Sequence, residues 1–332
     1  MVKYVVKRLW YMAAVFLIVS AVLYFLYHLI PGDPVKAELA NFVKENKNLT
    51  VEQIEAEKQA ITVRLGLDKP LPLRYVRWIA GLLTGNFGYS QSYRQPVAQV
   101  IVAPMQNTVI LNLMSVVLAL SLTIPLGIAC AVKKNSVFDR VTQIVTMVGY
   151  GVPVYIIALL FIYIFAVVLR WFPVSGMNTP GAEFSSVSGW LIDRIKYMAL
   201  PLLVMTAGSL GGMTRYVRTA MVDALGQDYI RTARAKGLPE RVVIFSHAWR
   251  NALLPVIALI ISWFLGIFGG SLIIENIFGL NGVGKLLYDA LMQKDYELVL
   301  AAQMFYVVIS LAGNLFLDLI YGVVDPRIRV AG

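Results

Sequence analysis

Six uncharged and largely apolar runs divide the chain. They cover residues 9–30, 109–132, 141–169, 197–214, 251–274 and 298–317. A helix needs roughly 20 apolar residues to cross a bilayer, and in lipid a helix satisfies its own backbone hydrogen bonds. The pattern therefore predicts an all-α polytopic membrane protein with six transmembrane helices, of which the fourth is the shortest.

Composition agrees with this interpretation. Hydrophobic residues make up 58% of the 332 residues, and charged residues make up only 14%. Soluble domains carry about a quarter charged residues, so the excess apolar surface belongs in lipid. The first run is long for the apolar core of a signal peptide, and no Ala-x-Ala cleavage site follows it. We therefore expect a retained span and not a cleaved leader.

Basic residues determine the expected orientation. Lys3, Lys7 and Arg8 precede the first run, which places the N-terminus in the cytoplasm under the positive-inside rule. Six spans then return the C-terminus to the cytoplasm, and the basic connections 133–140 and 215–250 fall on the same side. The net charge of +10 is thus a signal of topology and of attraction to anionic lipid headgroups, and it does not indicate nucleic-acid binding.

A long polar segment, 31–104, is expected outside the membrane. Thr50 and Gln53 have the spacing of a helix start in which the two residues cap each other. Residues 73–83 have the spacing of a second amphipathic helix, and 85–90 are rich in turn formers. The segment is either a small cap at the outer interface or a docking surface for an external protein, and composition alone favours the cap.

Three of the predicted spans contain residues that break helices or allow close helix packing. These are Gly149, Gly151 and Pro153 in the third, Pro201 and the glycines of 208–212 in the fourth, and Gly266 and Gly270 in the fifth. Small residues let membrane helices approach closely, and proline bends a span. Tight packing and mobile helices that line a pathway are both consistent with this pattern.

Polar and ionisable side chains are few within the apolar runs. They are Asn112, Gln143, Asn314 and Asp318, and no acid lies near mid-membrane, so a proton- or sodium-driven cycle has little support. The chain has no phosphate-binding loop, no His-Glu-x-x-His and no Gly-x-Ser-x-Gly. One cysteine and two distant histidines argue against a metal site. We expect no enzymatic activity and an energy source on another chain.

The connection between the fourth and fifth spans contains the most specific local pattern. Residues 223–236 are rich in helix formers, with basic residues gathered toward the C-terminal end, where they suit the helix dipole. Gly237 follows and can close the helix in a left-handed conformation, and Pro239 fits the first turn of a second helix. The glycine, the proline and the apolar Ile230, Leu238 and Phe245 favour a formed, docked element over a solvated basic loop.

This connection resembles the cytoplasmic signature loop of ABC importer permeases. Arg231-Thr-Ala233 stands in the place of its Glu-Ala-Ala, Gly237 is its glycine, and Leu254-Pro255 ends it. Where this loop differs from the general form, it is similar to the form found in the dipeptide, oligopeptide and nickel permeases. Matching segments also occur at 30–34, 65–70, 85–88, 173–176 and 319–329, so the resemblance covers nearly the whole chain.

The resemblance implies a non-catalytic permease subunit with the type I ABC importer permease fold in a prokaryotic inner or plasma membrane. Its expected partners are a second homologous permease in a heterodimer, two cytoplasmic ATPase subunits that hold ATP and magnesium, and an extracytoplasmic solute-binding protein, for which 31–104 becomes the expected surface. The chain itself would hold no cofactor or metal. The residues expected to couple to an ATPase are Asp228, Tyr229, Arg231, Thr232, Ala233, Arg234, Ala235, Lys236, Gly237 and Leu238, with Arg250, Asn251, Leu254 and Pro255 at the loop end.

The expected organisation is an N-terminal tail and first span (1–30), the external segment (31–104), a transmembrane domain (97–323) with its coupling loop (215–250), and a cytoplasmic tail (324–332). The expected cargo is di- or oligopeptides, with nickel chelates or oligosaccharides as the alternative. A stand-alone secondary transporter and a non-transporting scaffold or receptor are the competing functions. The residues that contact the substrate are not identified by the sequence.

Overall fold

The computed structural model describes residues 2–29, 34–46, 49–64, 66–184 and 186–324. The motif at 30–34 lies outside these ranges except for Pro34, and so does the cytoplasmic tail from residue 325 onward. Two compact units share the chain: one comprises Met1–Ile101 and Asp289–Val308, and the other Val102–Tyr288 and 309–332. Helices dominate both units, and one short β-hairpin, β1 (Tyr89–Ser90) with β2 (Gln95–Pro96), is the exception among the described residues.

Among the described residues, five helices are long and apolar enough to cross a membrane. They cover Val6–Leu29 within α1 (Val2–Leu29), α5 (Val97–Val132), α8 (Val187–Leu225), the continuous helical stretch Glu240–Phe268, and Tyr296–Asp318 within α14 (Tyr296–Val324). A sixth candidate is the pair formed by α6 (Val137–Gly151) with α7 (Val154–Phe161) and its π-helical continuation η1 (Ile162–Val168). The predicted all-α membrane fold is confirmed, and each of the six apolar runs falls on one of these candidates.

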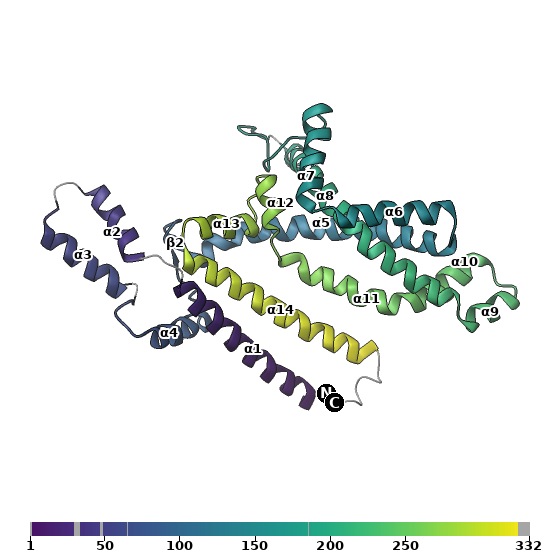
Figure 1. The fold of residues 1–332 in the computed structure, drawn as a ribbon, viewed down its shortest axis with the longest axis horizontal. Helices are drawn as coiled ribbons and strands as arrows, with labels where there is room; N and C mark the ends of the chain where they lie inside the picture. The colour runs from purple at the N-terminus through teal and green to yellow at the C-terminus, as the bar shows by residue number, and fades with distance from the viewer. Residues whose placement is uncertain (1, 30–33, 47–48, 65, 185, 325–332) are drawn as a thin grey trace. The chain divides into compact units, whose positions relative to one another are not determined.

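The third predicted span is sharply bent. The axes of α6 and of the α7–η1 helix differ by 102° (Figure 1). Val152 takes an extended conformation between them, with φ −84° and ψ 127°. Pro153 explains this, because the residue before a proline is pushed out of the helical region and the proline has no N–H for the ladder. The expectation that Pro153 interrupts the span is confirmed.

The predicted lengths of two other spans are wrong. The fourth helix, α8, is far longer than the apolar run 197–214 and continues through charged residues at both ends. Its start is set by Ser186, whose side chain accepts a hydrogen bond from the Gly189 N–H at 3.1 Å. The fifth helical stretch ends at Phe268 and not at 274, and a separate short helix, α12 (Leu272–Ile277), follows the pair Gly269-Gly270.

Glycines allow very close packing at particular places. A Cβ on Gly211 of α8 would collide with the backbone carbonyl of Thr146 and lie 2.7 Å from the Cβ of Tyr150, both on α6. A Cβ on Gly127 of α5 would lie 2.7 Å from Val217 of α8. Gly266 differs, because a Cβ added there would meet no atom within 4 Å. The small residues thus serve packing at some positions and leave open space at another.

Part of the polar segment that follows α1 packs against this helix. Helix α4 (Leu71–Leu83) packs on α1 through a hydrogen bond of 2.8 Å between Tyr75 and Ser20 and through the rings of Trp78 and Tyr24, 5.1 Å apart. The predicted amphipathic helix 73–83 is therefore confirmed. The mixed-charge stretch before it forms two helices, α2 (Pro34–Glu45) and α3 (Val51–Arg64).

The sequence predicts two local features of this segment, a helix cap and a turn-rich stretch. Thr50 and Gln53 cap each other at the start of α3, with N–H to side-chain oxygen distances of 2.9 and 3.3 Å, as their spacing predicts. The turn-rich stretch leads into the β-hairpin. Asp295, just before α14, holds this hairpin by accepting hydrogen bonds from the Ser90 hydroxyl at 2.5 Å and from the Ser92 N–H at 3.1 Å.

Candidate coupling site

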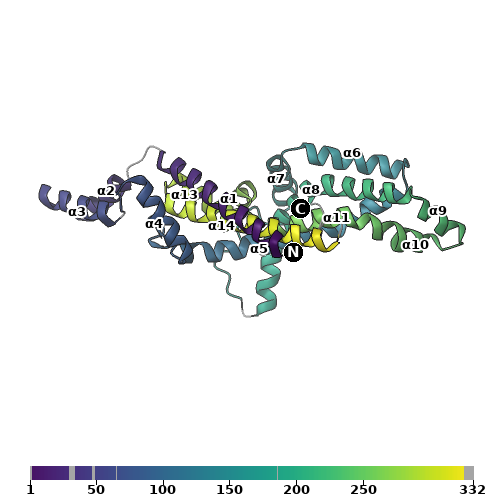
Figure 2. The same cartoon turned by 90° about the horizontal axis from the view of Figure 1, so that it is seen from below.

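Helix α9 (Asp228–Ala235) forms one end of the second unit, together with the short helix α10 (Glu240–Val242). Helices α6, α8 and α11 (Arg250–Leu265) run side by side toward this end (Figure 1 and Figure 2). A single helix over 223–236 is wrong, because α8 ends at Leu225 and α9 begins at Asp228. The break falls at Gly226 and Gln227, which separate a membrane-spanning helix from a short, independently oriented one.

Gly237 closes α9 as the sequence predicts. Its φ is +75°, in the left-handed region that glycine adopts without steric cost. The Gly237 N–H donates to the Arg234 carbonyl at 2.9 Å, and the Leu238 N–H donates to the Ala233 carbonyl at 3.3 Å. These two bonds form a Schellman motif, which satisfies carbonyls that the helix end leaves open. Pro239 stands immediately before α10 and not inside its first turn.

One face of α9 is docked on the rest of the unit. Ile230 is fully buried and Ala233 is 5% exposed, in a cluster with Met221 of α8, Val243 and Ala248. The last two belong to η2 (Val243–Trp249), a π-helical segment that leads into α11. The prediction of a docked element is confirmed for Ile230. It is wrong for Leu238 and Phe245, which are 37% and 52% exposed and are not part of this cluster.

The opposite face of α9 is exposed and mostly polar. Its exposed residues are Asp228, Tyr229, Arg231, Thr232, Arg234, Ala235 and Lys236. Arg234 is held across the turn by Glu240, with Nη2–Oε1 and Nε–Oε2 distances of 2.6 and 3.2 Å. The hydrogen bonds to this carboxylate raise the pKa of Arg234 above its ordinary value. The side chain therefore braces the Gly237 turn from outside while the buried face holds it from inside.

The loop-end residues occupy the beginning of α11. Arg250, Asn251, Leu254 and Pro255 are exposed. Ala252 and Val256 of the same helix are buried in the same cluster as Ile230. The Asn251 side chain donates to the His247 carbonyl at 2.7 Å. The structure thus joins α9 and the start of α11 through one apolar core.

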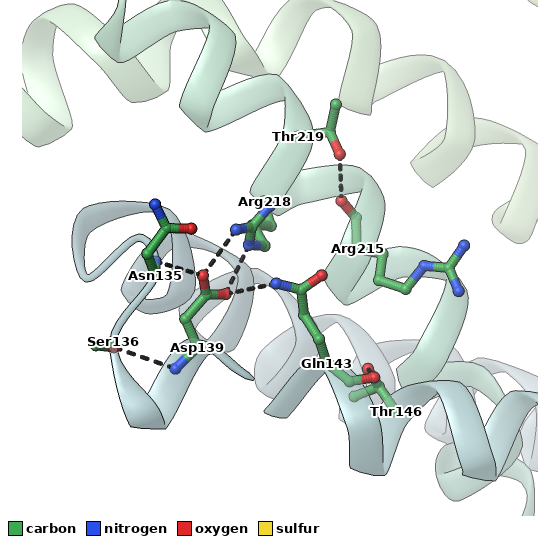
Figure 3. Close-up of polar contacts among 8 residues, drawn as sticks. All are labelled: Asn135, Ser136, Asp139, Gln143, Thr146, Arg215, Arg218 and Thr219. Atoms are coloured by element: carbon green, nitrogen blue, oxygen red, sulfur yellow. Dashed lines mark hydrogen bonds and ion pairs between the residues drawn. The ribbon is translucent and has the colours of Figure 1, made fainter. Parts of the chain in front are cut away.

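A buried ion pair lies beside this assembly, and the sequence did not reveal it. Asp139, in the first turn of α6, is 1% exposed and receives Nε and Nη2 of Arg218 on α8 at 2.6 and 2.7 Å. Figure 3 shows that the Asn135 N–H and the Gln143 amide also point at this carboxylate, at 2.8 and 2.9 Å. A bidentate arginine with further donors is the arrangement in which a buried carboxylate is well satisfied.

The neighbouring arginine of α8 behaves differently. Arg215, one turn earlier, is exposed and its guanidinium points away from Asp139 (Figure 3). A sequence signal for one partner did exist: Ser136 precedes Asp139 with the spacing of a helix cap, and its hydroxyl accepts the Asp139 N–H at 3.2 Å. Nothing local indicated that Arg218 would complete the pair.

A second buried carboxylate lies in the part of the chain that follows α11. Glu275 of α12 is 1% exposed and accepts hydrogen bonds from the Thr108 hydroxyl at 2.9 Å and from the N–H groups of Lys285 and Ser271 at 3.0 and 3.2 Å. Burial raises the pKa of Glu275, and these hydrogen bonds act in the opposite direction. Glu275 thus ties α12 and the start of α13 (Val283–Met292) to α5, which makes this connection a rigid structure.

Two family models together cover nearly the whole of this architecture. Residues 123–330 match the family described as binding-protein-dependent transport system inner membrane component, and residues 1–112 match the N-terminal part of such membrane components. The chain belongs to this family of inner membrane permeases. The permease is therefore a non-catalytic, multi-pass subunit of an ABC importer that works with ATPase subunits and a binding protein, and the predicted family, fold class and membrane location are confirmed.

Relatives match over essentially the full length. The oligopeptide transport system permease protein AppB of Bacillus subtilis is 34% identical over 99% of this chain and 100% of its own length. The dipeptide transport system permease protein DppB of Escherichia coli is 33% identical, and the glutathione transport system permease protein GsiC of Salmonella paratyphi A is 32% identical, each over 99% of both chains. A solved amino acid ABC transporter chain shows 15% identity and a TM-score of 0.48 over 67% of this chain and 93% of that one.

Proposed function

We propose that the permease forms the translocation pathway for di- and oligopeptides. The observation that carries this proposal is the full-length similarity to relatives named for oligopeptide, dipeptide and glutathione transport. The assembly we propose has a second homologous permease as heterodimeric partner, two ATPase subunits on the cytoplasmic side, and a solute-binding protein outside. The external segment 31–104 is the proposed surface for the binding protein, and its hairpin is held firmly by Asp295.

The substrate class is testable with the complete complex in vesicles that contain ATP. We expect ATP-dependent accumulation of radiolabelled dialanine and trialanine when the binding protein is supplied outside. A nickel chelate and an oligosaccharide serve as competing cargoes in parallel vesicles. Uptake of either one without peptide uptake would overturn the peptide assignment. Accumulation by the permease alone under a proton or sodium gradient would overturn the ATP-driven role.

We further propose that α9 is the element that an ATPase subunit moves. Two features support this. Its buried face joins α8 and α11 through Ile230 and Ala233, so it is anchored on two spans, and its exposed face presents Tyr229, Arg231 and Lys236 for contact with a partner. A lever of this kind must be rigid, because a flexible loop absorbs a displacement. The Schellman closure at Gly237 and the Arg234–Glu240 pair provide that rigidity.

Reversing the charge of Arg234 in the Arg234–Glu240 pair tests this role. We expect Arg234→Glu to place two carboxylates side by side across the turn, leaving the protein folded in the membrane but lowering peptide uptake several-fold while ATP hydrolysis persists. Both groups are about half exposed, so the pair adds little to global stability. The exchange variant, with Arg234→Glu and Glu240→Arg together, should restore uptake. Normal coupling in the single variant would contradict the role, and failure of the exchange to restore it would point to direct ATPase contact by Arg234.

A further inference from the structure

A cavity of about 270 Å³ lies between α5, α8 and α11 with its 3-10 helical continuation η3 (Gly266–Phe268). All three helices contribute polar residues to its lining, and none of the lining residues is ionisable. Asn112 and Ser115 come from α5, Ser209 from α8, and Ser262 from α11. A space of this size is slightly below the range of roughly 300–1,000 Å³ typical of small-molecule sites. It therefore has room for part of a peptide and not for a long one.

The cavity lies at the end of a candidate membrane-spanning helix. Helix α11 ends at Leu265, tightens into η3, and gives way to extended backbone at Gly269. The Asn112 amide nitrogen donates to the carbonyls of Ile267 and Gly269, both at 2.8 Å. Gly266 has no neighbour where a side chain would begin, so its surface belongs to the cavity.

Two polar atoms on the lining of this space make no hydrogen bond to a described residue. Because both carbonyls can only accept, they direct the Asn112 nitrogen toward themselves, and the other amide atom, Oδ1, has no partner in the described part of the chain. The Ser115 hydroxyl also makes no hydrogen bond to a described residue, although Ser115 is only 5% exposed. Ser209 differs, since its hydroxyl donates to the Met205 carbonyl at 2.9 Å. Unlike the unpaired hydroxyls of Thr123, Thr206 and Thr214, these two atoms are not fully shielded, so a molecule in the cavity can reach them.

We propose that this cavity is a subsite of the translocation pathway that holds a peptide by its backbone. The proposal rests on the peptide-import function proposed above. Asn112 Oδ1 accepts from a peptide N–H, and the Ser115 hydroxyl donates to a peptide carbonyl. These are the two groups that every peptide presents whatever its side chains. The absence of ionisable lining residues leaves peptide charge unrecognised, and Trp263 and Ile267 offer apolar contact to side chains of many kinds.

Thiol labelling tests whether the cavity is a wet, peptide-accessible site in the complete complex. The chain has one cysteine, Cys130, which is fully buried, so new cysteines can be labelled without a competing reaction at Cys130. We expect a charged methanethiosulfonate reagent to modify Ser115→Cys and Ser262→Cys, and trialanine delivered by the binding protein to slow both reactions. Ser121→Cys is the matched control on α5: it is exposed, is not part of the lining, and should show no protection by peptide. An unreactive Ser115→Cys would overturn the proposal, because another subunit then fills the space.

Transport kinetics give the second readout. We expect Ser115→Ala to raise the KM for trialanine uptake about 2- to 10-fold, the effect of one lost neutral hydrogen bond, with little change in maximal rate. Ser115→Leu should fill the cavity and block uptake, whereas Ser121→Ala should behave as the unmodified protein. Peptide uptake that is unaltered by both Ser115 variants would overturn the subsite while leaving the proposed function intact. Absence of peptide uptake by the unmodified complex would instead overturn the function itself.

Discussion

Arg218→Met should destabilise the permease by about 3–5 kcal/mol, the usual cost of removing one partner of a buried ion pair. The Asp139 carboxyl group would stay buried, at 1% exposure, and lose its two shortest hydrogen bonds. Thermal unfolding of the purified protein in detergent measures the loss. The same variant should uncouple ATP hydrolysis from uptake, because the pair joins the start of α6 to the part of α8 that leads into α9.

Two companion variants make the result interpretable. Arg215→Met removes the neighbouring arginine, which is exposed and points away from Asp139, and it should change stability little (Figure 3). The double variant Asp139→Leu with Arg218→Met removes both charges and should recover much of the lost stability, because an apolar pair often replaces a buried ion pair without net cost. Coupling should stay impaired in that double variant. Equal stability of Arg218→Met and Arg215→Met would contradict a structural role for the pair.

Gly211→Ala should be the most damaging single-methyl addition in α8. The new methyl would overlap the Thr146 carbonyl and the Tyr150 side chain of α6, so the helices must separate. Overpacking of this kind costs about 1–3 kcal/mol. The next residue provides the control, since a Cβ on Gly212 would lie 3.8 Å from the Tyr150 ring. Gly212→Ala should leave the unfolding temperature unchanged or raise it, because alanine favours helix over glycine. A similar loss in both variants would contradict the packing argument.

The existence of the spans could be predicted from the sequence, whereas their ends could not. Apolar length reports how much of a helix lies in lipid, and all six runs were found on that basis. The helix itself ends where its backbone groups find other partners. Ser186 starts α8 well before the apolar run, and Gly269 ends the fifth helical stretch within its run. Pro153 could be recognised as a break, because its effect on the preceding residue is local.

The coupling site shows the same division between local and distant effects. The closure of α9 at Gly237 depends on one residue's backbone freedom, so the sequence predicts it. The sequence does not predict the break at Gly226, because strong helix formers flank it and their propensity does not show where α8 ends. Asp139 and Arg218 are separated by 79 positions, and Thr108 and Glu275 by 167. No pattern in a single sequence identifies which distant charge or hydroxyl will meet a given carboxylate, because tertiary packing decides it.

The Asp139–Arg218 contact also bears on how the bent pair of helices lies in the bilayer. The start of α6 and the far end of α8 must lie at the same membrane surface, since their side chains touch at 2.6 Å. Helix α8 makes one crossing, so the chain between residues 137 and 187 has to make another in the opposite direction. The bent pair of α6 and α7–η1, whose halves of 15 residues each reach only about 22 Å at 1.5 Å per residue, is therefore the segment that we expect to make this second crossing.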